Sequence, residues 1–300
     1  IKEDLSKFLA SEVLLKNRNK EIPAPDSEEN SEIDERKTWI TDEELYYSKE
    51  NAECLSKILS MKLLTNWLLN IKDTVSDDIE LISKPILSML SSYINRGGEI
   101  VATEDTPVSF CSRLRLHAGI PLLKIDQVPA YDDFIDQRRI NRLILLIQDV
   151  ESQVRYLFLN KLKKRLTQNK ISRRFLALIF FIAHEPDSSL RSDTTTWIRA
   201  SFAKQNTKAN SKNSLVFEKS YIRLLYMLST HPEFRELYMA YKGKENNADV
   251  ENTVIGSEPN SESESELLRK FKEVSTFALT YIVFSLSLIM TSDNISLLYY

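Results

Sequence analysis

The residues best suited to chemistry in this sequence are basic and lie close together between positions 155 and 174. This stretch holds eight lysines and arginines and no acid: Arg155, Lys161, Lys163, Lys164, Arg165, Lys170, Arg173 and Arg174. The chain as a whole is nearly neutral, with a formal net charge of −3. A solvated surface usually mixes both signs of charge. The local excess therefore indicates either a surface for an anionic partner (an acidic peptide, an inositol polyphosphate or DNA) or an ordinary solvated face.

The same stretch also carries the apolar spacing of a helix that packs on a core. Apolar residues three and four positions apart form one stripe: Val154, Leu157, Phe158, Leu162 and Leu166. This spacing leaves Tyr156, Asn160, Lys163 and Lys164 pointing away from the stripe. The core accounts for the stripe but not for the basic residues.

No set of residues in the sequence is typical of catalysis or of metal binding. His117, His184 and His231 are scattered, and none has a Cys, Asp or Glu partner at the spacing of metal ligands on one helix. The sequence also lacks a glycine-rich phosphate loop, a GxSxG motif and an HExxH motif. We predict no catalytic residue, no metal site and no required cofactor, and thus a protein that is not an enzyme.

The composition predicts an all-α fold. Only 5 Gly and 9 Pro occur in 300 residues, which leaves few of the turn residues that sandwiches and barrels need. Apolar spacing of three and four recurs almost everywhere and predicts about a dozen helices. Thr41 to Glu44 has the form of a capping box, and Thr106-Pro107 marks a second helix start. Two lone thiols, Cys54 and Cys111, favour a reducing compartment, the cytosol or the nucleus.

A repeated pattern predicts how the helices are arranged. Arg115, Arg155 and Arg191 each follow an apolar residue at the predicted start of a helix, at intervals of 40 and 36 residues, and Asp149 and Asp187 precede the last two. This is the period of a HEAT repeat, in which Asp and Arg of neighbouring repeats can pair along the stack. We therefore predict a HEAT-repeat α-solenoid of antiparallel helix pairs, as a single domain over residues 1–300. Arg115, Asp149, Arg155, Asp187 and Arg191 are its structural positions.

Three segments depart from this pattern or mimic another one. Acidic stretches at about 20–37 and 243–264 have little apolar mass and are predicted to be mobile loops. Val274 to Met290 has 17 residues without a charge, the lower limit for a membrane span. We interpret it as a helix buried on most sides and expect no membrane.

The first residues look like the middle of a helix rather than a signal peptide, and we expect a fragment of a longer solenoid.

Several motifs resemble one known family. They are KTWITDEEL (37–45), MKLLTNWLLNIK (61–72), SRLRLHAGIPLLKIDQVPAY (112–131), QVRYLFLNKLKKRL (153–166), AHEP (183–186) and YMLSTHPEF (226–234). In order and content they are similar to the precocious-dissociation-of-sisters family of cohesin-associated proteins. The resemblance covers nearly the whole chain, is most specific from Ser112 to Leu166, and corresponds to the carboxy-terminal half of the family's repeat body. The acidic stretches and Pro121 depart from the family pattern and are typical of a fungal form.

The resemblance implies a non-enzymatic regulator of sister-chromatid cohesion in the nucleus, associated with chromosomes. Such proteins bind a segment of the kleisin subunit of cohesin, near its junction with an SMC subunit. They act on maintenance and release of the cohesin ring with the wings-apart-like release factor and the cohesin acetyltransferase, so that contact with chromatin is indirect. Animal members bind inositol hexakisphosphate in this half, and Arg155, Lys161 and Lys164 fall where the family is similarly basic.

Our hypothesis for the kleisin-binding surface combines the resemblance with the basic stretch. It assigns Tyr156, Lys161, Lys164, Arg165, Arg173 and Arg174 to that surface and leaves Arg155 to pairing between repeats. A HEAT scaffold that binds DNA directly is the main alternative, and strong salt dependence would distinguish it. A karyopherin-like adaptor is a second alternative, although no motif supports it.

Overall fold

A computed structural model shows an all-α chain, as the composition predicts. It describes residues 2–17, 37–71, 76–101, 106–206, 215–231 and 261–292, with the isolated residues 235, 239, 294, 295 and 298. No strand occurs in these ranges. The chain divides into two compact units, residues 1–175 and 176–300. Each unit is described by itself below, and the single domain over 1–300 stays a prediction. Both acidic stretches lie almost entirely outside the described residues.

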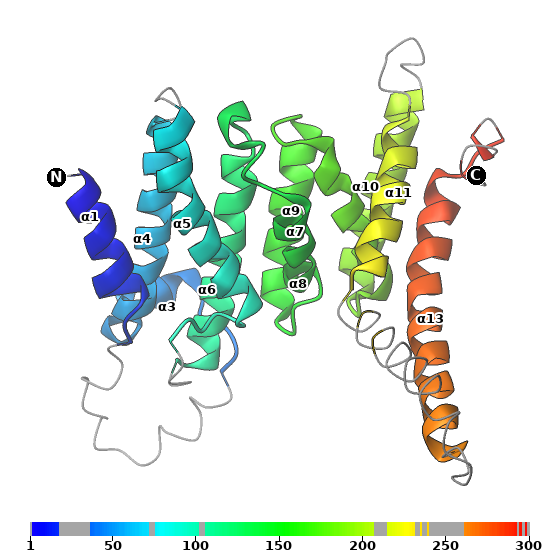
Figure 1. Cartoon of the computed structure of the whole chain (residues 1–300), viewed down its shortest axis with the longest axis horizontal. Coiled ribbons are helices and arrows are strands. Elements are labelled where there is room, and N and C mark those ends of the chain that lie inside the picture. Colours follow the sequence, from blue (N-terminus) through cyan, green and yellow to red (C-terminus); the bar gives the residue numbers. More distant parts are fainter. Residues whose placement is uncertain are drawn as a thin grey trace, which may run out of the picture. The chain divides into compact units, whose positions relative to one another are not determined.

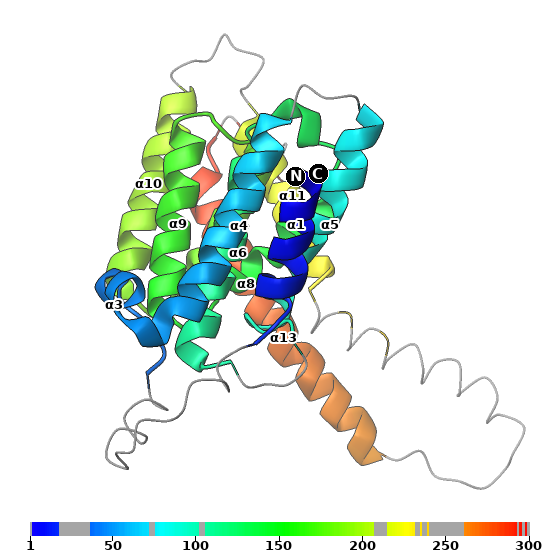
Figure 2. The same ribbon diagram turned by 90° about the vertical axis from the view of Figure 1, so that its left-hand side faces the viewer.

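Unit 1 is built from two layers of helices. One layer holds α4 (Ala52–Asn70), α6 (Val108–Ile125) and α9 (Ser152–Thr167), with α6 packed between the other two. The other holds η1 (Leu9–Leu14), which continues α1 (Lys2–Phe8), then α5 (Ser76–Asn95), α7 (Gln137–Arg142) and α8 (Ile144–Ile147). Figure 2 shows α4 and α9 on one side and α5 on the other, with α1 at the near end. This arrangement of stacked helix pairs is the solenoid architecture that the repeat pattern predicts.

Local sequence signals explain where two helices of unit 1 begin. The capping box is confirmed: Thr41 Oγ1 accepts from the Glu44 backbone N–H, and Glu44 Oε2 accepts from the Thr41 N–H. It starts the short helix α3 (Asp42–Tyr47). The α6 helix begins at Val108, so that Pro107 is its N-cap rather than its first helical residue.

A nearly buried ion pair joins two helix pairs of unit 1. Arg115 Nε and Nη2 donate to the two carboxylate oxygens of Asp149 at 2.7 and 2.8 Å, and Arg115 Nη1 donates to the Gly97 carbonyl at 2.6 Å. The side chains of Arg115 and Asp149 are 11% and 3% exposed. One guanidinium thus ties the end of α5, the middle of α6 and the turn before α9. Arg115 lies two turns inside α6, however, and not at a helix start as the repeat pattern predicts.

The turn before α9 recurs in the other unit, before α10 (Ser188–Asn206). In the sequence Asp149-x-Glu151-x-x-x-Arg155, Asp149 Oδ1 accepts from the Glu151 N–H, and Glu151 caps the helix by accepting from the Gln153 N–H. Arg155 then donates back to the Asp149 carbonyl at 2.7 Å.

Glu185-x-Asp187-x-x-x-Arg191 makes the equivalent contacts 36 positions later. Glu185 Oε1 accepts from the Asp187 N–H, and Asp187 accepts from the N–H of Ser189. Arg191 donates back to the Glu185 carbonyl at 3.2 Å. The recurring Arg therefore closes a local turn in both places, which gives the 36-residue interval between Arg155 and Arg191 a structural cause.

Unit 2 contains the rest of the 3₁₀ segment η6 (Arg173–His184), then α10, α11 (Val216–Ser229) and α13 (Ser261–Ile289). Residues 175–182 of η6 are all buried. The α13 helix packs on both α10 and α11, and all three are labelled in Figure 1. Three rings of unit 2 are in contact, Phe277, Tyr281 and His184, with centroids 4.6 to 4.9 Å apart: His184 stacks on Phe277, and Tyr281 meets both edge-on.

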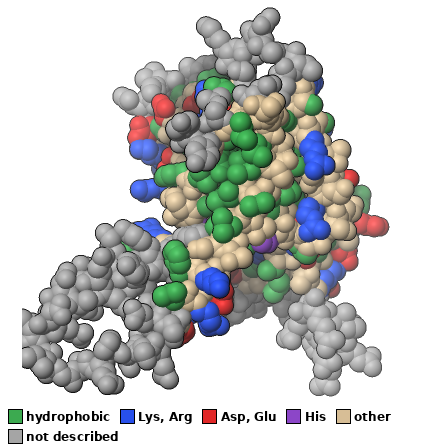
Figure 3. Space-filling model, turned by 90° about the vertical axis from the view of Figure 1, so that its right-hand side faces the viewer, with side chains coloured by type: hydrophobic (Ala, Val, Ile, Leu, Met, Phe, Trp, Pro, Cys, Tyr) green, Lys and Arg blue, Asp and Glu red, His purple; other side chains and the backbone are tan. Residues whose placement is uncertain are grey.

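The prediction that the apolar segment near the carboxyl end is buried on most sides is wrong. Only 28% of the most apolar window of Leu268–Ile289 is buried, although by length and composition it could cross a membrane. Leu279 and Val283 of α13 are 54% and 62% exposed, and Ile222 of α11 is 65% exposed. Figure 3 shows hydrophobic side chains gathered on the face nearest to α13. The spacing of apolar residues identifies a helix, but it does not show which neighbours cover it.

We expect Asp149→Ala to lower the free energy of unfolding by about 3 kcal/mol, because it leaves the nearly buried Arg115 guanidinium without its partner. The measurement is urea denaturation followed by circular dichroism. Glu80→Ala, which removes the exposed ion pair between Glu80 and Lys84, is the control and should cost less than about 1 kcal/mol. Equal effects of the two substitutions would contradict the structural role of Asp149.

Candidate anion-binding interface

The α9 helix buries its apolar stripe and exposes part of its basic residues. Val154, Phe158, Leu162 and Leu166 are fully or almost fully buried, whereas Lys161 and Lys164 are exposed. These two lysines are three positions apart and thus lie one above the other on the same side of the helix. Neither forms an ion pair with an acid among the described residues.

A histidine on α6 shows which residues surround Lys161. The pKa of His117 is lowered to about 4, mainly by burial and in addition by the positive charges of Lys62, Arg113 and Lys161, against an opposite effect of Asp42. Lys62 belongs to α4 and Lys161 to α9. His117 therefore lies near a lysine on each of the two helices that pack against α6.

Two polar contacts extend this surface toward the carboxyl ends of the helices. Lys124 of α6 donates to Asn66 Oδ1 of α4 at 2.6 Å. Arg165 of α9 donates to the Leu123 carbonyl of α6 at 3.2 Å. The second contact places the turn that holds Lys164 beside the turn that holds Lys124. We call Lys62, Lys124, Lys161 and Lys164 the lysine cluster.

Exposed apolar side chains accompany the lysine cluster on α4. Leu59 and Leu63 are 48% and 46% exposed; Leu59 lies one turn before Lys62, and Leu63 lies one turn before Asn66. Tyr46 is also half exposed, and its hydroxyl accepts from Lys62 Nζ at 3.5 Å. A surface of this kind can bind an anionic group through the lysines and an apolar side chain beside it. None of its residues forms a cluster that could hold a metal ion, within the described part of the chain.

Comparison with known proteins shows the family of this chain. The family model described as "Sister chromatid cohesion protein PDS5 protein" matches residues 1–300. The chain is similar to Sister chromatid cohesion protein PDS5 of Saccharomyces cerevisiae, with 30% identity over 304 residues, 99% of this chain and 21% of that protein. It belongs to the PDS5 family of sister chromatid cohesion proteins.

Two further members of the PDS5 family show how widely the likeness extends. PDS5 homolog A of Homo sapiens is 27% identical over 241 residues, 78% of this chain and 16% of that protein. The pds5 protein of Schizosaccharomyces pombe is 26% identical over 238 residues, 79% of this chain and 18% of that protein. The chain thus spans about a fifth of the length of these relatives, and the resemblance read from its motifs is confirmed.

The structure brings together only part of the surface that the sequence hypothesis assigns to a partner. Lys161 and Lys164 lie in the lysine cluster. Tyr156 is 49% exposed, but it is five positions from Lys161 and points about 140° away from it on the helix. Tyr156 therefore lies on the flank of α9 that faces away from Lys161.

Three of the predicted partner-binding arginines are engaged within unit 1 instead. Arg174 donates to Asp126 at 2.6 Å and to Asp132 at 3.3 Å, and Asp126 has a fully buried side chain. Arg165 is held by the Leu123 carbonyl, and burial lowers its pKa. Arg173 remains exposed and donates to Asn169. Arg174, which the sequence hypothesis assigns to the kleisin-binding surface, is thus paired with two acids of the α6–α7 segment.

Sequence reasoning missed Lys62, His117 and Lys124 as members of the site. Each comes from a helix other than α9, at a separation of 37 to 99 residues from Lys161, so no local spacing could link them. The available signal was that Lys62 and His117 stand inside two of the motifs that carry the family resemblance.

We expect Lys161→Glu to raise the pKa of His117 from about 4 toward its ordinary value, because the substitution replaces a repelling charge by an attracting one. The measurement is a pH titration of the imidazole signals by NMR. Lys164→Glu is the matched control and should shift the pKa of His117 less, since Lys164 is not among the charges that act on it. Equal shifts would mean that Lys161 does not lie beside His117.

Proposed function

We propose that this chain takes part in the control of sister-chromatid cohesion as a non-enzymatic binding scaffold in the nucleus, and that it does so by holding a segment of the kleisin subunit of cohesin. The chain covers only about a fifth of its relatives, all of which are called sister chromatid cohesion proteins. Its partners in the control of cohesion would be the SMC subunits, the wings-apart-like release factor and the cohesin acetyltransferase, with chromatin contacted indirectly.

The observation that carries the proposal is the lysine cluster across three helices. The three helices pack side by side, and Lys124 of α6 contacts Asn66 of α4 while Arg165 of α9 contacts Leu123 of α6, so the cluster spans three helices rather than the side of one. Leu59 and Leu63 add exposed apolar area beside it. An acidic segment with an apolar residue at intervals fits this combination better than a purely ionic ligand would.

A segment of this kind suits a regulated contact. A chain that is disordered when free must be ordered on binding, which typically costs about 2 to 5 kcal/mol of the interaction energy. Lysines at the surface mainly raise the association rate and are screened by salt. The result is a contact that forms readily and that competing partners can release.

We expect Lys161→Glu to weaken binding of a peptide from the amino-terminal third of the kleisin by about tenfold, since one favourable charge contact is replaced by a repulsion. The double variant with Lys164→Glu should abolish saturable binding. The measurement is calorimetric titration of the full chain, with circular dichroism to verify that the helices are retained.

Arg138→Glu is the control for this titration. Arg138 is an exposed cation of α7, in the opposite layer of unit 1, and its reversal should leave peptide binding unchanged. An equal loss of peptide affinity in all variants would indicate a non-specific effect of net charge. Binding that Lys161→Glu leaves intact would place the kleisin elsewhere.

Direct binding of DNA is the second candidate, because four lysines that form no ion pair with a described acid can also neutralise phosphates. Salt separates the two candidates. Binding of DNA through several phosphates would fall by orders of magnitude between about 50 and 200 mM salt, whereas a segment that also buries apolar residues on Leu59 and Leu63 would lose less.

Inositol hexakisphosphate is proposed as a ligand of the lysine cluster by family resemblance. If the cluster binds it, calorimetry should show one site, and the Lys161→Glu and Lys164→Glu double variant should weaken it by about a hundredfold, from two lost charge contacts. Arg138→Glu should leave the affinity unchanged. Unchanged affinity in the double variant would exclude the lysine cluster as the inositol phosphate site.

A further inference from the structure

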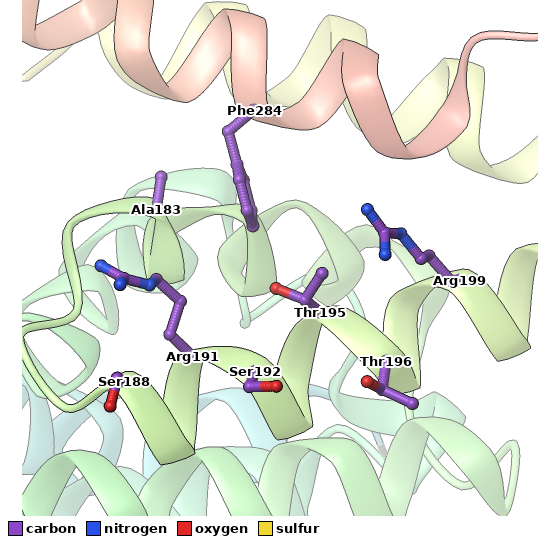
Figure 4. A pocket seen from close by; sticks show the side chains of 8 residues that line it. All are labelled: Ala183, Ser188, Arg191, Ser192, Thr195, Thr196, Arg199 and Phe284. Atoms are coloured by element: carbon purple, nitrogen blue, oxygen red, sulfur yellow. The ribbon is translucent and has the colours of Figure 1, made fainter.

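Unit 2 contains a cavity that the proposed function does not use. It has a volume of about 420 Å³ and lies between α10 and α13. Six of its residues form one side of α10, at helical spacing: Ser188, Arg191, Ser192, Thr195, Thr196 and Arg199. Ala183 of η6 and Phe284 of α13 complete it. Figure 4 shows the Phe284 ring between the guanidinium groups of Arg191 and Arg199.

The lining is cationic and rich in hydrogen-bond donors. It holds two arginines and no acid. Asp187 and Asp193 belong to the same segment of chain, but neither lines the cavity. Asp187 already caps the start of α10, by accepting from the N–H groups of Ser189 and Leu190. The cavity therefore offers side-chain donors rather than a free helix end.

The two arginines differ in whether their guanidinium groups already have a hydrogen-bond partner. Arg191 donates to the Glu185 carbonyl at 3.2 Å and so has a fixed position. The guanidinium of Arg199, which is exposed, has no partner within the described part of the chain, and the same holds for the hydroxyls of Ser192 and Thr195. Arginine binds carboxylates and phosphates through two parallel N–H groups, so these donors are suited to anionic side chains.

The spacing of the arginines restricts the ligand further. They are eight residues apart on one helix, which corresponds to about 12 Å along its axis. In an extended peptide, side chains at positions i, i+2 and i+4 share one face, and four residues span about 13 Å. An anionic side chain at i would thus meet one arginine, one at i+4 would meet the other, and the residue at i+2 would lie on Phe284.

We propose that this cavity binds an extended peptide segment with two anionic side chains four positions apart and an apolar side chain midway between them. The anionic groups are carboxylates of Asp or Glu, or phosphates on Ser or Thr, because both fit the paired donors of arginine. The site consists of residues of unit 2 alone, and the inference does not depend on kleisin binding at the lysine cluster.

The test uses short fluorescent peptides of designed sequence, in which two Glu flank a central Leu at i, i+2 and i+4 within a Gly-Ser background. A second peptide carries phosphoserine in place of Glu, and a third has the same composition with the two Glu adjacent. We expect the full chain to bind the first or the second peptide at least about tenfold more tightly than the third, because only the correct spacing reaches both arginines. Whichever of these two peptides binds more tightly shows whether the cavity prefers carboxylates or phosphates.

Variants locate the binding in the cavity. Arg199→Glu should weaken the best peptide by about tenfold or more, and Phe284→Ala should weaken it while leaving a peptide with Gly at i+2 unaffected. Lys219→Glu, which reverses an exposed charge of α11 outside the cavity, should have no effect. The Lys161→Glu and Lys164→Glu double variant of unit 1 should also bind normally, which separates this inference from the proposed function.

Two results would overturn the proposal. One is equal affinity for all three peptides, or affinity that Arg199→Glu leaves unchanged, since either result indicates attraction by net charge alone. The other is Arg199-dependent binding of inositol hexakisphosphate without binding of any peptide, which would make the cavity a site for a small polyanion. Circular dichroism of each variant verifies that the helices are intact.

Discussion

The nearly buried pair between Arg115 and Asp149 is the interaction on which unit 1 depends. A carboxylate with 3% exposure is tolerated only because a guanidinium meets both of its oxygens. The same guanidinium reaches the Gly97 carbonyl, and Asp149 also accepts from the Glu151 N–H. The start of α9 is thereby fixed relative to α5 and α6. The positions of Lys161 and Lys164, further along α9, follow from that anchor.

Guanidinium groups and ammonium groups have different tasks in this unit. Arg113, Arg155 and Arg174 donate to carbonyl or carboxylate oxygens inside the stack. This suits arginine, whose planar group can serve several acceptors and loses less hydration energy on burial. Lys161 and Lys164 stay at the surface, where a compact hydrated charge is stable, whereas the one buried lysine among the described residues of the unit, Lys57, is paired with Glu53. A basic stretch that appears uniform in the sequence is thus divided into a structural set and an exposed set.

The sequence predicts what is local and misses what depends on distant neighbours. The capping box at Thr41 lies within three residues of its partner, so spacing alone identifies it. Spacing also finds the recurring Arg155 and Arg191, but it predicts pairing between repeats for them, whereas both donate to a carbonyl of their own turn. Whether Arg174 is free depends on Asp126, 48 residues away, and the exposure of α13 depends on which helices cover it. The lysine cluster requires three helices to be adjacent, which the repeat period suggests without giving their rotation.

The two candidate sites use cations in ways that call for different ligands. The lysine cluster is open and carries flexible ammonium groups, so it favours charge of one sign without requiring a fixed geometry. The α10 cavity places Arg191 by a hydrogen bond to its own turn and sets Arg199 at a fixed helical distance. Fixed donors discriminate by spacing, because a misplaced anion leaves one of them unpaired. The turn that closes the repeat at Arg191 therefore also orients a donor toward the cavity, and the repeat architecture itself supplies the selectivity.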